Sequence, residues 1–311
     1  DPATPLPNAT RVTVTIDGSA MSDAGRSLGQ PYRFTFTTPT VRLTSMRWYR
    51  RQDRFDQPVM LVLNFNQRVR AEDVLAHAQA RYEPHDWDAP VLSERARARL
   101  TATEPNGVAA FDARVAAARQ TAARRDAITL RGASDWDRER FPPKDTMVVL
   151  ETTTVPPPGT WIELTIDAQM PGVEGTAPPP QAQRSTAELD PVFFAYGFAC
   201  DQACDPSGYN GLRFSTPVNI SRFATALSVR DITTASNEQI VRQKTTVPAT
   251  SLDTETSPGL EDAGYDRQPP ARTFVYRLPP TLQARDGQTL GTPWIGIVEN
   301  CNGFSNTGNV Q

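Results

Sequence analysis

The sequence has no apolar run near the roughly 18 residues that a helix needs to cross a bilayer. It also lacks a surplus of either charge, since 32 basic and 35 acidic residues are interspersed and the formal net charge is −3. A nucleic-acid partner would require a basic patch or stripe, which is not present. We therefore expect no transmembrane segment within this sequence and no nucleic-acid partner.

Residues that carry catalysis or bind metals are equally scarce. The only histidines are His77, in "VLAHAQARY", and His85, in "EPHDWD"; these contexts are typical of a surface helix and a solvated loop. The Gly-x-Ser-x-Gly turn that presents a hydrolase nucleophile does not occur. The acidic stretch "DWDRER" lacks the spaced oxygen ligands of a calcium loop. We expect no catalytic residues, no cofactor and no metal, and hence a protein that is not an enzyme.

The three cysteines allow a disulfide but not a typical zinc site. Cys200 and Cys204 lie in "CDQAC", and Cys301 is far downstream. Zinc would need a fourth ligand and more typically a two-residue spacing. Three disulfide pairings are open. Cys200–Cys204 would pin a loop before the next strand, whereas a bond from either of them to Cys301 would tie the ends of the last domain together.

Alternating apolar and polar residues dominate what is present, and 28 Pro with 18 Gly mark many turns. Predicted strands cover residues 11–17, 32–38, 59–65, 146–153, 160–167, 191–199, 211–218, 272–278 and 293–300. Short strands between Pro- and Gly-rich turns are typical of antiparallel sandwiches. The predicted fold is mainly β and consists of tandem antiparallel Ig-like β-sandwiches.

One pattern, which we name the head, occurs in "LVLNFNQRVRAEDV" (61–74) and again in "GLRFSTPVNISRF" (211–223). Both contain Leu-x-Phe, then Val four residues later, then an apolar residue five further on. The matching residues are Leu63, Phe65, Val69 and Val74 in the first copy and Leu212, Phe214, Val218 and Phe223 in the second. The head predicts a strand, a turn and the start of a helix.

A second pattern, the tail, is a strand, a wide loop turned by glycine, and a closing strand. It occurs at 10–34 with Gly25, at 272–297 with Gly287, and loosely at 159–179 with Gly175. Glycine supplies the positive φ that such turns often need. The first tail has no head, and two strands cannot build an independent sandwich. Either this tail completes a neighbouring domain, or the chain derives from a longer tandem array, which we favour.

Pairing heads with tails divides the chain into three parts. Residues 1–40 are predicted to be the C-terminal strands of an incomplete β-sandwich, 41–190 a second sandwich, and 191–311 a third. Segment 171–190 is predicted to be a Pro-rich loop or linker. The polar run 233–270 is predicted to be a long loop of the last domain.

The middle domain is interrupted by an Ala- and Arg-rich segment at about 92–126. Its residues Val108, Phe111, Val115 and Ala118 fall on one helical face, and Pro105 and Asn106 sit where a second helix would start. We predict a helical hairpin inserted between sandwich strands. It either covers a sheet edge as a solvated ornament or docks a partner, and Phe111 and Arg114 are the interface candidates.

Aromatic residues give one more candidate surface. Trp48 and Tyr49, followed by Arg50 and Arg51, lie near a predicted domain junction and are candidates for an interface between modules or with a partner. Trp161 and Trp294 alternate within strands and are assigned to cores. Exposed aromatics gathered on one sheet would instead favour a polysaccharide-binding platform.

The segment "TRVTVTIDGSAMSDAGRSLGQPYRFTFTTPTVRL" followed by "PVMLVLNFNQRV" resembles the N-terminal macroglobulin-type, Ig-like β-sandwich modules of bacterial alpha-2-macroglobulin-like proteins. The resemblance implies a non-enzymatic scaffold or interaction module that is exported to the periplasm or cell surface. Protease-trapping members carry a thioester on Cys-x-Glu-Gln, which none of the three cysteines matches. Only an N-terminal scaffold is therefore implied.

Two alternatives remain open for the function. The chain is an accessory structural subunit that docks on a larger membrane-associated complex through its helices and long loops, or an ancillary domain of a polysaccharide-acting enzyme. The missing head of the first tail favours a scaffold or a subunit, because both allow a chain derived from a longer ancestor. A protein partner is expected in either case.

Overall fold

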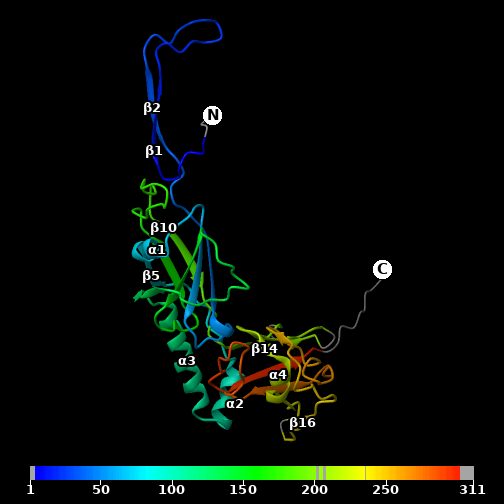
Figure 1. Ribbon diagram of the computed structural model, residues 1–311. Helices are drawn as coiled ribbons and strands as arrows, with labels where there is room; N and C mark the ends of the chain where they lie inside the picture. Colours follow the sequence, from blue (N-terminus) through cyan, green and yellow to red (C-terminus); the bar gives the residue numbers. More distant parts are fainter. Residues whose placement is uncertain (1–3, 201–202, 206–207, 235, 302–311) are drawn as a thin grey trace, which may run out of the picture.

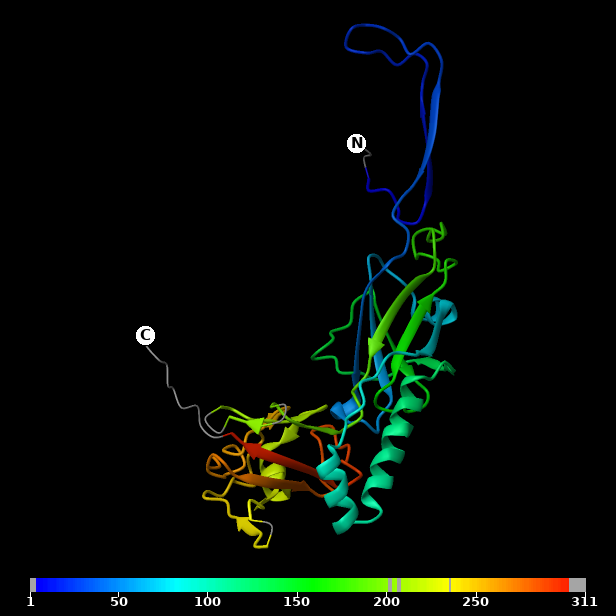
Figure 2. The same ribbon diagram turned by 180° about the vertical axis from the view of Figure 1, so that it is seen from behind.

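The computed structural model describes residues 4–200, 203–205, 208–234 and 236–301. Three parts follow each other along the chain (Figure 1): an extended N-terminal hairpin, a middle sandwich and a last sandwich. The hairpin projects from one end of the middle sandwich, and the last sandwich lies at the opposite end. The view from behind, in Figure 2, shows the same separation.

The elements follow the chain in this order. The hairpin consists of β1 (Arg11–Ile16) and β2 (Tyr32–Thr37). The middle part contains β3 (Leu43–Arg50), η1 (Arg51–Asp53), β4 (Val59–Phe65), α1 (Ala71–His77), β5 (Ala78–Glu83), α2 (Glu94–Thr103), α3 (Gly107–Ala122), β6 (Ala127–Ile128), β7 (Leu130–Gly132), β8 (Met147–Thr152), β9 (Trp161–Ile166) and β10 (Gln183–Glu188). The last part contains β11 (Ala195–Phe198), β12 (Ala203–Cys204), β13 (Leu212–Phe214), β14 (Val218–Asn219), α4 (Ile220–Ala226), β15 (Ser228–Asp231), β16 (Gln239–Val241), β17 (Thr254–Glu255), β18 (Thr273–Leu278) and β19 (Trp294–Asn300).

The middle sandwich consists of two four-stranded antiparallel sheets, with strand orders β3-β4-β8-β7 and β10-β9-β5-β6. Their inner faces form one core, in which Leu61, Leu63, Leu150, Ile162 and Leu164 are fully buried. The outer face of β4 is buried too, because Met60 and Val62 pack with Tyr49 and Phe141. Burial on both faces explains why β4 is a continuous apolar run rather than an alternating one.

The last sandwich has a five-stranded sheet with the order β12-β19-β18-β15-β16, faced by the pair β11-β13. All its strand pairs are antiparallel except β12 with β19. Its core contains many aromatic side chains, among them Phe193, Phe214, Phe223, Phe274 and Tyr276. The predicted fold class, tandem antiparallel β-sandwiches with a helical insertion in the middle one, is confirmed.

The two heads have the same structure. In the first, α1 follows β4 and leads into β5. In the second, β13 and the two-residue strand β14 precede α4, which leads into β15. Helices α1 and α4 both have seven residues and start at matching sequence positions. Val74 of α1 and Phe223 of α4 are the matching apolar residues, and both point into their cores. Each head ends in a strand that pairs antiparallel with the first strand of its own tail, β5 with β9 and β15 with β18.

Two sequence predictions need correction. The segment 171–190 is not all loop, because its second half forms β10, the closing strand of the third tail. The strand prediction missed it since only Ala187 of "QRSTAE" is buried there, which leaves no apolar alternation. His77 lies in a helix as expected, at the end of α1. Strand β5, which follows it, and strand β3, which carries Trp48, were not predicted. The polar run 233–270 also contains the short strands β16 and β17.

A glycine-lined contact attaches the root of the N-terminal hairpin to the middle sandwich. Ala9 is fully buried there, and its carbonyl accepts a hydrogen bond from the amide of Ala177 at 2.7 Å. The amide of Asn8 donates to Glu174 at 2.9 Å. A Cβ on Gly175 would lie only 2.3 Å from the Ala9 carbonyl oxygen and 2.6 Å from that of Asn8. Only glycine therefore allows the two chain segments to approach so closely.

We expect Gly175→Ala to loosen this root and to cost about 1–3 kcal/mol of local stability, because backbone atoms would have to move to admit the methyl group. Hydrogen exchange should show faster exchange at the amide of Ala177, with the strands of the middle sandwich unchanged. Gly132→Ala is the matched control, since a Cβ on Gly132 meets nothing within 4 Å. Equal exchange in both variants would contradict the expectation.

Candidate functional site at the junction of the two sandwiches

The junction between the two sandwiches is built around one buried guanidinium. Arg50, the last residue of β3, is 2% exposed. Its Nε donates to Oδ2 of Asp190 at 3.0 Å, and its terminal nitrogens donate to the carbonyl oxygens of Gln57 at 2.7 Å and Pro156 at 2.8 Å. Asp190 belongs to the segment that leads from β10 into the last sandwich. The side chain therefore binds that connecting segment to the middle sandwich.

The charges of this pair lie in a site that disfavours charge. Burial is the main cause that lowers the pKa of Arg50 and raises the pKa of Asp190; their mutual attraction opposes both shifts. The nearby carboxylate of Asp286 further raises the pKa of Asp190. Buried ion pairs often add little net stability over apolar residues but become costly when one partner is removed. We infer that this pair mainly fixes geometry.

The last sandwich holds the other side of the connecting segment through the loop of its tail. Gln288 is buried, and its Nε2 donates to the carbonyl oxygen of Pro191 at 2.9 Å and to Asp286 at 2.7 Å. Its Oε1 accepts from the amide of Phe193 at 3.0 Å. The amide of Phe55 reaches across from the middle sandwich to the carbonyl oxygen of Asp286 at 3.2 Å. Both sandwiches therefore bind the segment by directional contacts.

Helices α2 and α3 contribute the apolar part of the junction. The face predicted from the sequence, Val108, Phe111, Val115 and Ala118, packs into the core cluster of the last sandwich. Phe111 is 2% exposed and meets Phe194 edge to face, with ring centroids 6.2 Å apart. Leu100 of α2 is fully buried in the same cluster. Among the described residues, no side chain of the insertion belongs to the core cluster of the middle sandwich.

Ion pairs surround this apolar contact. Arg99 of α2 binds Glu238 at 2.8 Å, and further pairs join Arg95 to Glu299 and Glu104 to Arg277. Arg114 of α3 lies over the ring of Phe194 at 5.1 Å and donates to the carbonyl oxygens of Phe193 and Thr289. The insertion is therefore neither a solvated ornament nor a free docking element: it joins the two sandwiches of this chain.

The predicted interface residues divide into two groups. Arg50, Phe111 and Arg114 meet at the junction. Trp48 packs against the middle core, the hydroxyl of Tyr49 accepts from the amide of Asp137, and Arg51 pairs with Asp135 at 3.1 Å. These three lie within the middle sandwich. Asp190, Asp286 and Gln288 were missed, because a lone polar residue in a turn gives no sequence signal that it will be buried.

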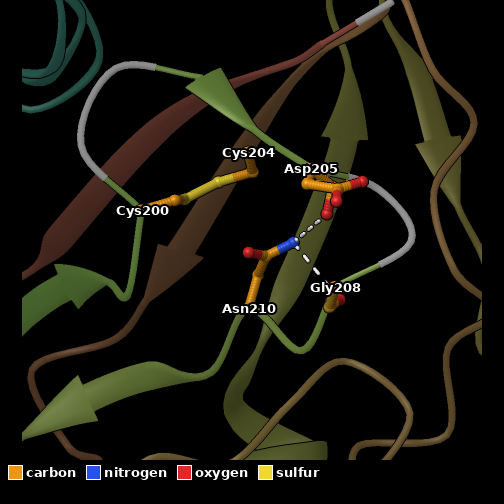
Figure 3. The surroundings of a disulfide bond; sticks show 5 residues. All are labelled: Cys200, Cys204, Asp205, Gly208 and Asn210. Carbon is orange, nitrogen blue, oxygen red and sulfur yellow. Dashed lines mark hydrogen bonds between the residues drawn. A yellow bond between two sulfur atoms is a disulfide. The ribbon is translucent and has the colours of Figure 1, made fainter. Parts of the chain in front are cut away.

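The cysteines gather at one edge of the last sandwich. Cys200 and Cys204 are joined by a disulfide, the shortest of the three predicted pairings (Figure 3). Cys301 keeps a free, half-buried thiol, and its amide donates to the carbonyl oxygen of Cys204 at 3.0 Å. Below the disulfide, the Asn210 side chain donates to the carbonyl oxygen of Asp205 at 2.6 Å. The bond thus ties Cys200, two residues after β11, to the last residue of β12.

We expect Cys200→Ser to lower the free energy of unfolding by about 2 kcal/mol, because chain entropy gives only a small gain for so short a loop. Urea unfolding of the variant should match that of the wild-type protein in reductant. Cys301→Ser, which leaves the disulfide intact, is the control and should change stability by less than about 0.5 kcal/mol. A loss above about 4 kcal/mol for Cys200→Ser would instead indicate that a longer loop had been closed.

The histidines have structural partners. Nδ1 of His77 lies 2.9 Å from a carboxylate oxygen of Asp167, and the ring of His85 stacks on Trp161 with centroids 4.2 Å apart. Within the described ranges, no group of three or more His, Cys, Asp or Glu residues is arranged to hold a metal ion. No helix in these ranges is both long and apolar enough to cross a bilayer.

No protein-family model matches the chain, and no curated protein matches it either. Among solved structures the chain is similar to native alpha-2-macroglobulin from Escherichia coli spanning domains MG0-NIE-MG1. The identity is 11%, the match covers 83% of this chain and 71% of that chain, and the TM-score is 0.25. A similarity at this TM-score carries no argument about function.

Proposed function

We propose that the protein is a non-enzymatic scaffold or interaction module that acts outside the cytoplasm, like the N-terminal part of a bacterial alpha-2-macroglobulin-like protein. One observation carries the proposal: helices inserted in the middle sandwich complete the core of the last one. Together with the buried Arg50–Asp190 pair, this makes the two sandwiches a single body. Such a body is suited to holding a projecting element in place, and the N-terminal hairpin is such an element.

The disulfide supports the proposed location. Disulfides persist in oxidising compartments such as the periplasm and the cell exterior and are rare in the reducing cytosol of most organisms. A Cys200–Cys204 bond is therefore expected to form after export.

The location and the assembly can be tested on the protein in its own cell. Thiols are trapped by alkylation in intact cells, the cells are fractionated, and the protein is separated by size and mapped by mass spectrometry. We expect an oxidised Cys200–Cys204 pair in an extracytoplasmic fraction. Reduced cysteines in the cytosol would contradict the proposal. Co-purification with a membrane complex would instead support an accessory structural subunit.

A second candidate function is favoured by one observation. Tyr32, Phe34 and Phe36 form an exposed aromatic row on β2, with neighbouring ring centroids 6.0 and 6.2 Å apart. Such a row is one form that a sugar-stacking platform of an ancillary polysaccharide-binding domain would take. Binding of soluble polysaccharides, lost in Phe34→Ala, would support it.

A further inference from the structure

The N-terminal hairpin presents one face that is entirely apolar. Antiparallel pairing sets Val12 opposite Phe36, Val14 opposite Phe34, and Ile16 opposite Tyr32, so all six side chains share that face. The other face carries only threonine and arginine. Tyr32 is 57% exposed, and no residue of the hairpin strands is fully buried. An isolated two-stranded hairpin is marginally stable at best, so an apolar face of this kind needs a cover.

The tail of the last sandwich shows the same hairpin with its cover in place. Leu278 pairs with Trp294 as Ile16 pairs with Tyr32, and the bridges Gln283–Thr289 and Met21–Ser27 follow at equal distances along the chain. The loop hydrogen bonds also match: the amide of Leu28 donates to Ala20 and that of Leu290 to Leu282, both at 2.8 Å. Gly25 and Gly287 both have positive φ at the corresponding turn.

Positions that are uncovered in the first tail are core positions in the other two. The counterparts of Val12, Val14 and Ile16 are Ile162, Leu164 and Ile166 in the middle sandwich and Phe274, Tyr276 and Leu278 in the last one. All six of these counterparts are at most 2% exposed. Trp294, the counterpart of Tyr32, is 4% exposed and packs against Phe198 of the facing strand. The apolar face of the first hairpin therefore corresponds to the inner face of a sandwich.

The edge of the hairpin is incomplete in the same way. In both complete sandwiches the first tail strand also pairs with the last strand of the head, β9 with β5 and β18 with β15. Among the described residues, β1 pairs only with β2. The missing neighbour of β1 is thus a strand that follows a short helix, as β5 follows α1 and β15 follows α4.

We propose that the apolar face and the free edge of the hairpin bind a third head, a strand–helix–strand unit of protein outside residues 1–311. Its last strand pairs antiparallel with β1 and sets an apolar residue opposite Val14, as Ala80 lies opposite Leu164 and Val229 opposite Tyr276. The interface continues a sheet pairing and an inner face that both other modules of the chain use. The inference rests on the proposed scaffold function and names the partner of its projecting element.

The same comparison favours a protein partner over a polysaccharide. The row Tyr32–Phe34–Phe36 lies against Val12, Val14 and Ile16, so apart from the Tyr32 hydroxyl this face offers no polar side chain to hydrogen-bond a sugar. In the last sandwich the corresponding positions hold Trp294, Gly296 and Val298, and the ring of Trp294 lies over Gly296. An aromatic and aliphatic face of this kind packs against another sheet.

The test compares the two faces of the hairpin by their access to a thiol reagent. Phe36→Cys on the apolar face and Thr35→Cys on the polar face are each introduced into the native gene with Cys301→Ser. Both should react readily in purified protein of residues 1–311. In intact cells we expect Phe36→Cys to react at least tenfold more slowly than Thr35→Cys. Equal reactivity of an exported, correctly oxidised protein would overturn this inference and leave the proposed function standing.

A photo-crosslinker at Phe34 identifies the cover. Crosslinks to apolar positions of a strand that follows a short helix, outside residues 1–311, are the expected result. Crosslinks between two hairpins would show that a second copy covers the face and would overturn the proposal. A third outcome would also overturn the proposal. If no protein crosslinks form, and the cysteine of Phe36→Cys becomes reactive in cells once polysaccharide is removed enzymatically, the face binds a polysaccharide.

Discussion

Replacing Asp190 by leucine is expected to lower the free energy of unfolding by about 3–5 kcal/mol, because it leaves the charge of Arg50 buried without its counter-ion. The two carbonyl oxygens of Gln57 and Pro156 would still accept from the guanidinium, but neither carries a formal charge. Urea unfolding, followed by a probe in each sandwich, measures the loss. The two sandwiches should also become easier to separate by limited proteolysis near residue 190.

The double variant Arg50→Met with Asp190→Leu separates the value of the pair from the cost of breaking it. We expect the double variant to be more stable than Asp190→Leu alone, because the guanidinium is no longer left buried without the carboxylate of Asp190. The control is Arg68→Met, which removes an exposed pair with Asp145 and should cost less than about 1 kcal/mol. If the double variant were as unstable as Asp190→Leu, the loss of stability would come from losing the ion pair and not from leaving Arg50 buried without its partner.

Asp190 should also leave a signature in the pH dependence of stability. Its pKa is raised in the folded protein, so the folded state binds the proton more tightly than the unfolded state does. Its contribution to stability therefore falls as the pH rises from about 4, the ordinary aspartate value, through the raised pKa. Carboxylates whose pKa is lowered, such as Asp112, act in the opposite direction. The free energy of unfolding is measured against pH for the wild type and for Asp190→Asn, and the difference between the two isolates the contribution of Asp190. A difference that increases with pH would contradict the expectation.

Phe111→Ala is the second change with a large expected effect. Truncating a buried phenylalanine costs about 3–5 kcal/mol. Although residue 111 lies within the sequence of the middle domain, its partners are in the last sandwich. Hydrogen exchange should therefore show lost protection in β18 and β19, with β4 and β9 unchanged.

The matched change for comparison is Leu164→Ala in the core of the middle sandwich, where this leucine is fully buried. It should produce the opposite pattern, with faster exchange in β4 and β9. If Phe111→Ala instead increased exchange in β4 and β9 more than in β18 and β19, the assignment of the helices to the core of the last sandwich would be wrong.

Repetition made the sandwich architecture predictable from the sequence. Leu63 and Leu212 begin two copies of one local pattern, and each copy folds into the same strand, helix and strand because the pattern encodes which positions are apolar. Two of the three tail glycines were equally informative, since Gly25 and Gly287 adopt the positive φ that their turns require. Gly175 does not, and glycine is needed there for its close contact with Ala9 instead. Local patterns of this kind can be interpreted without knowing which distant segments of the chain they pack against.

The junction could not be predicted, because its signals are not local. The apolar face with Phe111 was visible, but periodicity does not say which surface a helix covers. Arg50 was a candidate only as part of an aromatic and basic segment, and the sequence gives no hint that Asp190, 140 residues later, would bind it. Strand β10 was missed because a sheet neighbour, rather than its own apolar pattern, holds it in place.

The insertion of α2 and α3 has a consequence for synthesis of the chain. The helices leave the ribosome roughly 180 residues before Trp294, which closes the core that they complete. Translation adds about 5–20 residues per second, so the apolar helical face with Leu100 and Phe111 remains exposed for roughly ten to forty seconds. Once β10 has also emerged, and for the rest of that interval, the nascent protein can carry a folded middle sandwich with an exposed apolar helical face. A chaperone that binds apolar helices would find its best site on this chain there, and a chain stopped near residue 190 would retain that site permanently.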